Sequence, residues 1–140
     1  GYEGFSTVFN ELHGVKQGDV LGPLLFSLFV NDLPGFIRDG HASSPDLLRL
    51  LDVLVFCLLY ADDLALMHTT AAGLQLSLDR LFQWCRVNHM DVHLDKTKVV
   101  VFHPDRVPSS EADRQFYFGT PDKLLERLPL VRYLSVWFHE

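Results

Sequence analysis

The sequence predicts an α+β fold in which helices pack on one face of an antiparallel sheet. Two stretches place apolar residues at helical spacing, while residues 98–102 form a run of β-branched and aromatic residues. Helical and extended segments do not alternate in a regular βαβ rhythm, so a doubly wound parallel sheet is not expected. Of the 140 residues, 48% are hydrophobic, which provides enough apolar surface for a core.

The first half of the chain predicts one amphipathic helix between two loops. Residues 14–19 contain two glycines and form the first loop. Asp19 can cap the helix because its carboxylate can accept N–H groups of the first turn, where Pro23 is also tolerated. Asn31 to Pro34 ends the apolar face, and residues 36–45 are expected to form a loop. The apolar face consists of Leu21, Leu24, Leu25, Leu28 and Phe29.

The second half predicts a second helix followed by extended segments. Apolar residues at helical spacing between Leu74 and Cys85 predict a helix over residues 70–89. Residues 104–114 are polar and hold two prolines, which is typical of a surface loop. The strand candidates outside the central apolar stretch are residues 7–13, 98–102, 116–118 and 131–138.

The charge of the chain argues against a stand-alone nucleic-acid binder. The formal net charge is −6, whereas such binders usually carry a basic surface. The two cysteines, Cys57 and Cys85, form no C-x-x-C motif and no secreted-type disulfide framework, so an intracellular setting is expected. The longest apolar run, residues 53–61, is about half the roughly 20 residues of a membrane helix, and no signal peptide or membrane segment is expected.

Two adjacent acids interrupt the apolar stretch from Leu47 to Met67. Carboxylates are costly to bury, and neighbouring carboxylates repel each other. A tight turn after Ala61 would make residues 53–60 and 64–67 the strands of an antiparallel hairpin, with Asp62 and Asp63 exposed at its tip. Such a pair can bind a hard divalent cation, whose charge removes the repulsion. Taken alone, the two acids are better explained as a solvated turn.

Four stretches in order resemble the reverse transcriptases, in particular those of non-LTR retrotransposons. Tyr60-Ala-Asp-Asp63, between Leu-Leu and Leu-Ala-Leu, resembles the catalytic hairpin of that family. Two further matches flank this hairpin in the sequence. The stretches GVKQGD, VLGPLLF and VNDLP resemble the family's segment that precedes it, and WC and LDKTKVVVF resemble the segment that follows it. Arg132-Tyr-Leu-Ser-Val136 resembles the closing hairpin. Four ordered matches are far more specific than any single one.

The resemblance implies an RNA-directed DNA polymerase that adds deoxynucleotides to a primer 3′ end with two Mg²⁺ ions. Its partners would be an RNA template, a DNA primer and a deoxynucleoside triphosphate. Asp62 would be a metal ligand, and Asp63 would lie beside the site as a further catalytic and metal-binding residue. Lys96 would act on the triphosphate as a catalytic group. The residues implied to contact substrate are Gln17, Gly18 and Tyr60, and the hairpin implied to hold the primer includes Tyr133, Val136 and Trp137.

Departures from the family pattern suggest a partial domain. His93 stands where the family often has Asn, and Ser135 stands where it usually has Gly. The family also needs an aspartate on a strand upstream of GVKQGD, but residues 1–13 contain no Asp. Residues 1–140 are therefore expected to be a palm fragment that lacks the fingers, the first catalytic strand and the thumb. The negative charge then belongs to the palm alone, and the isolated chain should be inactive and bind nucleic acid weakly.

Three alternatives remain open. Cys85, His89 and His93 are spaced at i, i+4 and i+8, which would suit a zinc site on one helix face, although no fourth ligand is evident. The chain could instead be a catalytically inactive retroelement remnant or a structural module. A palm from another nucleotidyl transferase is the third reading, which the GVKQGD and YLS stretches disfavour.

Overall fold

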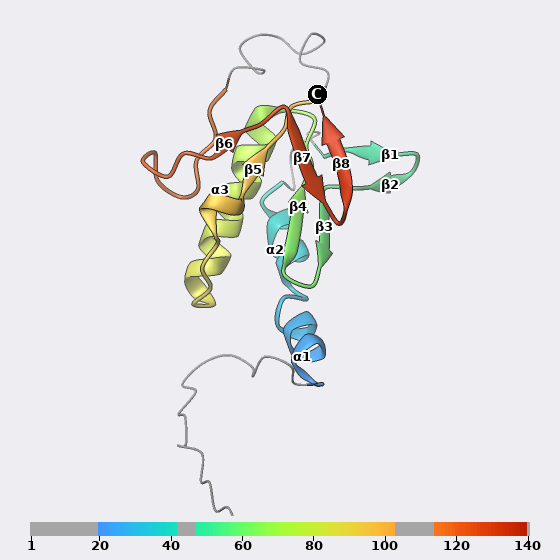
Figure 1. Ribbon diagram of the computed structural model, residues 1–140. Helices are drawn as coiled ribbons and strands as arrows, with labels where there is room; N and C mark the ends of the chain where they lie inside the picture. The colour runs from blue at the N-terminus through green and yellow to red at the C-terminus, as the bar shows by residue number, and fades with distance from the viewer. Residues whose placement is uncertain (1–19, 42–46, 103–113, 140) are drawn as a thin grey trace, which may run out of the picture. The chain divides into compact units, whose positions relative to one another are not determined.

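The computed structural model describes residues 20–41, 47–102 and 114–139, drawn as the coloured ribbon in Figure 1. The chain divides into two compact units, residues 1–31 and residues 32–140. The expected strand at 7–13 and the loop at 14–19, with Gln17 and Gly18, lie outside the described residues. So does nearly all of the expected loop at 104–114.

The first unit contributes one described helix, α1 (Gly22–Phe29), as the sequence predicts. Pro23 lies in its first turn, where a missing N–H costs nothing. The cap position is Leu21, whose side chain makes no capping hydrogen bond. The expected cap by Asp19 falls outside the described residues.

The second unit combines helices with short, mostly antiparallel strands, which confirms the α+β class. Its described elements are α2 (Leu33–Asp39), β1 (Arg49–Leu50), β2 (Val53–Leu54), β3 (Cys57–Tyr60), β4 (Asp63–Leu66), α3 (Ala71–Val87), the 3-10 helix η1 (Leu94–Lys96), β5 (Lys98–Val99), β6 (Glu126–Arg127), β7 (Leu130–Tyr133) and β8 (Val136–His139).

Helix α2 corrects the prediction of a loop beginning at residue 36. Pro34 lies in the first turn of α2, so it begins a helix where the sequence suggested only an end. Ile37 is fully buried, and α2 packs on α3. The polar residues that suggested a loop include Arg38 and Asp39, which form an exposed ion pair. A helix this short has a weak sequence signal and depends on packing for its stability.

Polar contacts attach α2 to α3. The guanidinium of Arg80 donates to the main-chain oxygen of Phe36 at 2.9 Å and stacks over the Phe36 ring at 3.8 Å. The indole N–H of Trp84 donates to the carboxylate of Asp32 at 3.1 Å. These contacts attach the N-cap and the middle of the short helix to α3.

Helix α3 confirms the predicted helix over residues 70–89. The Thr70 hydroxyl accepts a hydrogen bond from the Gly73 N–H at 3.0 Å and so caps the helix. The buried face repeats at helical spacing and supplies five of the twelve buried apolar residues in the described part of the chain. Its buried residues are Ala71, Gly73, Ser77, Leu78, Leu81, Trp84 and Cys85.

A polar cluster lies inside this packing. Ser77 is fully buried, and its hydroxyl oxygen lies 2.8 Å from Nε2 of both His41 and His68. The two imidazole rings stack with their centroids 4.9 Å apart. Since a hydroxyl has one proton, Ser77 donates to one imidazole and accepts from the other.

The described strands form four two-stranded sheets where the sequence predicts a single sheet. Three pairs are antiparallel, and β5 pairs with β6 in parallel. The predicted strand over residues 53–60 is interrupted at residues 55–56, because β2 pairs with β1 whereas β3 begins at Cys57 and pairs with β4. Of the predicted strand 98–102, only Lys98 and Val99 are paired.

The segment 116–118 contributes to the core without forming a strand. Phe116 and Phe118 are buried, and Tyr117 makes an isolated bridge with Leu124. The Phe118 ring meets the Phe82 ring of α3 edge to face, with centroids 5.4 Å apart. The aromatic composition that suggested a strand therefore reflects burial against α3.

Candidate active site at two hairpins

The predicted hairpin is present, with strands β3 and β4 joined by a two-residue turn (Figure 1). Tyr60 pairs with Asp63, which leaves Ala61 and Asp62 as the turn. Ala61 has φ 50°, a left-handed conformation that matches the tight reversal expected after this residue. The pairing of the two strands extends from the turn to Cys57 on β3 and Leu66 on β4.

Both aspartates lie exposed at the tip of this hairpin, as the sequence predicts. Asp62 occupies the turn, and Asp63 is the first residue of β4. Directly opposed residues of an antiparallel pair project from the same face. Asp63 and the exposed ring of Tyr60 therefore share one face of the hairpin.

A second hairpin, formed by β7 and β8, contains the expected closing stretch. Its turn residues, Leu134 (φ 46°) and Ser135 (φ 68°), both adopt left-handed conformations. The family pattern usually has Gly at the position of Ser135. The left-handed backbone angle of Ser135 explains this preference, because Gly adopts such angles without strain. The Arg132 guanidinium lies 5.9 Å from the Trp137 ring centroid, so a cation and an exposed aromatic ring neighbour each other on this hairpin.

Tyr133 joins the two hairpins. Its hydroxyl donates towards the main-chain oxygen of Leu58 on β3 at 3.4 Å and of Asp63 on β4 at 3.5 Å. Burial, then the Asp63 carboxylate and the Cys57 thiol, raise the pKa of Tyr133. The sequence pattern assigned Tyr133 to a hairpin, but it carried no signal for this contact between segments 70 residues apart.

Lys96 is not brought to the aspartates by any contact in the described part of the chain. It is exposed at the end of η1, and no hydrogen bond or ion pair with a described residue joins it to Asp62 or Asp63. The residues that follow it make structural contacts: Thr97 donates to the His93 oxygen at 3.1 Å, and Lys98 pairs with Glu126.

The two aspartates fit part of a magnesium site. Among residues 20–41, 47–102 and 114–139, no group of three or more His, Cys, Asp or Glu side chains could hold a metal. Mg²⁺ typically keeps several waters and takes one or two carboxylates from the protein, so an exposed pair suits it. The zinc alternative gains no support, because α3 ends at Val87, before His89 and His93.

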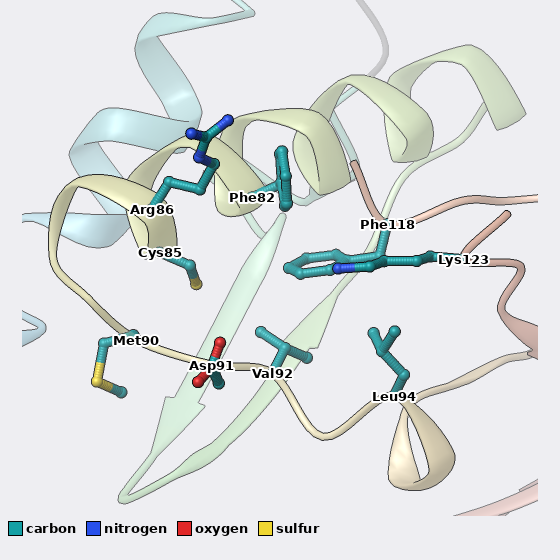
Figure 2. Close-up of a pocket in the computed structure, with 9 residues that line it drawn as sticks. All are labelled: Phe82, Cys85, Arg86, Met90, Asp91, Val92, Leu94, Phe118 and Lys123. Atoms are coloured by element: carbon teal, nitrogen blue, oxygen red, sulfur yellow. The ribbon is translucent and has the colours of Figure 1, made fainter. Parts of the chain in front are cut away.

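A cavity beside α3 does not belong to this site. Figure 2 shows Phe82, Cys85 and Arg86 of α3 on one side and Phe118 with Lys123 on another. None of the lining residues comes from β3, β4, β7 or β8. Its volume of about 80 Å³ is well below the roughly 300 Å³ at the lower end for ligand pockets. Burial and then the Asp91 carboxylate raise the pKa of Cys85, which favours an inert thiol.

An antiparallel hairpin with adjacent exposed aspartates at its tip, linked through Tyr133 to a second hairpin with a left-handed turn, is consistent with the palm of a polymerase. The profile of the family described as reverse transcriptase (RNA-dependent DNA polymerase) matches residues 2–138. The chain therefore belongs to the reverse transcriptase family, which confirms the resemblance drawn from the four motifs.

Curated relatives come from mobile elements of Drosophila melanogaster. The chain is 39% identical over 90 residues to the probable RNA-directed DNA polymerase from transposon BS, covering 60% of this chain and 9% of the relative. It is 32% identical over 95 residues to the RNA-directed DNA polymerase from mobile element jockey, covering 64% of this chain and 10% of the relative. It is 27% identical over 136 residues to the retrovirus-related Pol polyprotein from type-2 retrotransposable element R2DM, covering 95% of this chain and 12% of the relative.

The chain thus spans between 9% and 12% of the length of these three relatives. No solved structure matches the chain. No described helix is long and apolar enough to cross a membrane.

Proposed function

We propose that this chain is the palm part of an RNA-directed DNA polymerase of the non-LTR retrotransposon type. The polymerase adds deoxynucleotides to the 3′ end of a DNA primer along an RNA template. The observation that carries the proposal is the β3–β4 hairpin, whose turn exposes Asp62 and Asp63 side by side in sequence. Membership of the reverse transcriptase family supports it.

The proposed chemistry is a two-metal nucleotidyl transfer. Two Mg²⁺ ions, when bound, activate the attacking 3′ hydroxyl and neutralise charge on the leaving pyrophosphate. Asp62 is proposed as a direct ligand, and Asp63 as a supporting carboxylate beside it. The turn at Ala61 leaves both carboxylates exposed, and a bound cation would offset the repulsion between them.

Other residues are proposed to hold the substrates. Tyr60 shares a face with Asp63, which suits packing beside the primer end. The exposed Trp137 ring with Arg132 offers a stacking surface and a cation for the primer backbone. Lys96 is proposed to stabilise charge on the triphosphate, and Gln17 and Gly18 to approach the incoming nucleotide.

The isolated chain is proposed to be inactive and to bind nucleic acid weakly. Its described residues supply two carboxylates at the tip and no third, and the net charge of −6 repels a phosphate backbone. Template and primer would be held by cationic surfaces elsewhere in the polymerase. An inactive retroelement remnant is the second candidate, favoured by the left-handed Ser135 where Gly would be relaxed.

Primer extension by the full-length polymerase tests the proposal. With RNA template, Mg²⁺ and deoxynucleotides, the wild type should extend the primer and Asp62→Ala should reduce the rate by more than about 100-fold. This exceeds the roughly 10- to 100-fold typical of residues that only support a metal ligand. A wild-type enzyme that never extends a primer would favour the remnant.

The chain offers a matched control at Asp52. Leu51 and Asp52 form the turn between β1 and β2, and Leu51 has φ 56°, so Asp52 occupies the same turn position as Asp62. Asp52→Ala should leave extension near the wild-type rate. An equal loss in both variants would mean that the acids act on folding and not on metal.

A further inference from the structure

The β3–β4 hairpin needs support from outside itself. It contains only four paired positions on each strand, and isolated two-stranded hairpins are marginally stable in water. Its turn also holds Ala61 at φ 50°, a conformation that costs an L-residue of this kind about 1–2 kcal/mol. A loose hairpin would spread Asp62 and Asp63 over many positions.

Tyr133 supplies a contact to both strands of that hairpin. Its hydroxyl lies 3.4 Å from the oxygen of Leu58 on β3 and 3.5 Å from the oxygen of Asp63 on β4. Both distances are long for a hydroxyl donor, and one proton is shared between two acceptors. Each interaction is therefore weak, but together they restrain the two strands within four residues of the turn.

We infer that Tyr133 is a positioning residue, which holds the Asp63 main chain and thereby presents the Asp62–Asp63 pair to divalent metal. The inference rests on the proposed function and adds a role to a residue of the second hairpin.

The role concerns metal binding more than substrate binding. Tyr133→Phe keeps the ring and removes only the hydroxyl, so any change in metal binding reports the loss of the hydroxyl contacts. Without the hydroxyl, the carboxylates sample more positions before metal binds. Part of the free energy of metal binding is then used to order them. The half-saturating Mg²⁺ concentration should rise while the KM for deoxynucleotide stays constant.

The first test measures primer extension by the full-length polymerase over a range of Mg²⁺ concentrations. Tyr133→Phe should raise the half-saturating concentration about three- to tenfold, below the usual range for strong supporting contacts because these hydrogen bonds are long. The control is Tyr117→Phe, since the Tyr117 hydroxyl contacts the exposed Gln115 side chain. That control should match the wild type.

The second test does not depend on activity. Hydrogen exchange of residues 57–66 in the full-length protein should be faster in Tyr133→Phe than in the wild type and in Tyr117→Phe. Mn²⁺ binding, followed by electron paramagnetic resonance, should weaken by a similar factor in Tyr133→Phe alone.

Different results would contradict the inference on Tyr133 and the proposed polymerase function. If the wild type extends primers but Tyr133→Phe leaves the metal dependence, the Mn²⁺ affinity and the exchange of residues 57–66 unchanged, the inference on Tyr133 is wrong. If the wild type extends no primer, the proposed function fails, and the exchange and Mn²⁺ measurements still decide whether Tyr133 orders the hairpin.

Discussion

The hydroxyl of Tyr133 lies 3.5 Å from the main-chain oxygen of Asp63, although the two residues are 70 positions apart. This contact links the hairpin with the two aspartates to the hairpin at the end of the described chain. Both hairpins turn through left-handed residues, Ala61 in the first and Leu134 with Ser135 in the second. The candidate site therefore depends on two strained turns that support each other through one tyrosine.

The first prediction concerns the ionisation of Tyr133. Burial, and after it the Asp63 carboxylate, raise its pKa above the ordinary 10.0. The folded chain thus holds this proton more tightly than the unfolded chain. The stability linked to this shift is fully present below pH 10.0, and it is lost as the pH rises from there through the folded pKa of Tyr133. Urea denaturation at increasing pH should show this decrease, and Tyr133→Phe should remove that part of it.

A substitution at Asp63 checks the cause of this shift. Asp63→Asn removes the negative charge, so the pKa of Tyr133 should decrease towards its ordinary value in an ultraviolet titration. Asp52→Asn, which removes one negative charge at the turn between β1 and β2, should leave the Tyr133 titration unchanged. A Tyr133 titration that is identical in wild type and Asp63→Asn would contradict the proximity of the two groups.

The second prediction concerns the strained turn of the β7–β8 hairpin. Ser135 has φ 68°, and its hydroxyl accepts only a long hydrogen bond of 3.3 Å from Arg132. Ser135→Gly should increase the free energy of unfolding by about 0.5–1 kcal/mol, because Gly adopts this conformation without strain. Chemical denaturation of the chain measures the change.

The control for Ser135→Gly is Ser135→Ala. It removes the same hydroxyl and keeps the strain, so it should give no stabilisation. Equal effects of the two substitutions would assign the change to the hydroxyl and not to the backbone.

The third prediction concerns the buried cluster between α2 and α3. Ser77→Ala removes the partner of two imidazole nitrogens, each 2.8 Å from the hydroxyl. Leaving buried polar atoms without that partner should decrease the free energy of unfolding by about 2 kcal/mol. Ser27→Ala, at an exposed helical serine that bonds only the Pro23 oxygen, should change it by less than about 0.5 kcal/mol. Similar losses in the two variants would contradict a structural role for the cluster.

Local patterns were sufficient to predict the hairpin that carries the two aspartates and the long helix. Burying Asp62 and Asp63 within an apolar stretch would have a high free-energy cost. A turn between two strands avoids that cost by exposing both carboxylates, and the structure contains this turn. The helical repeat between Leu74 and Cys85 extended over enough turns to be unambiguous.

Features that depend on distant segments were missed. Helix α2 is short, and its stability comes from Arg80 and Trp84, which lie on α3. The segment 116–118 was assigned to a strand because its aromatic residues suit one, but they pack on Phe82. The Tyr133 contact with Asp63 likewise has no local signature, because neither residue type requires the other.

Metal-directed cleavage tests the central claim most directly. Fe²⁺ replaces Mg²⁺ in the full-length polymerase with primer, template and nucleotide, and peroxide then generates radicals that cut the main chain near the bound ion. The account predicts cuts at residues 60–63 in the wild type and in Asp52→Ala, and none there in Asp62→Ala. Cuts that persist at this hairpin in Asp62→Ala, or that never occur there in the wild type, would contradict a metal site at its tip.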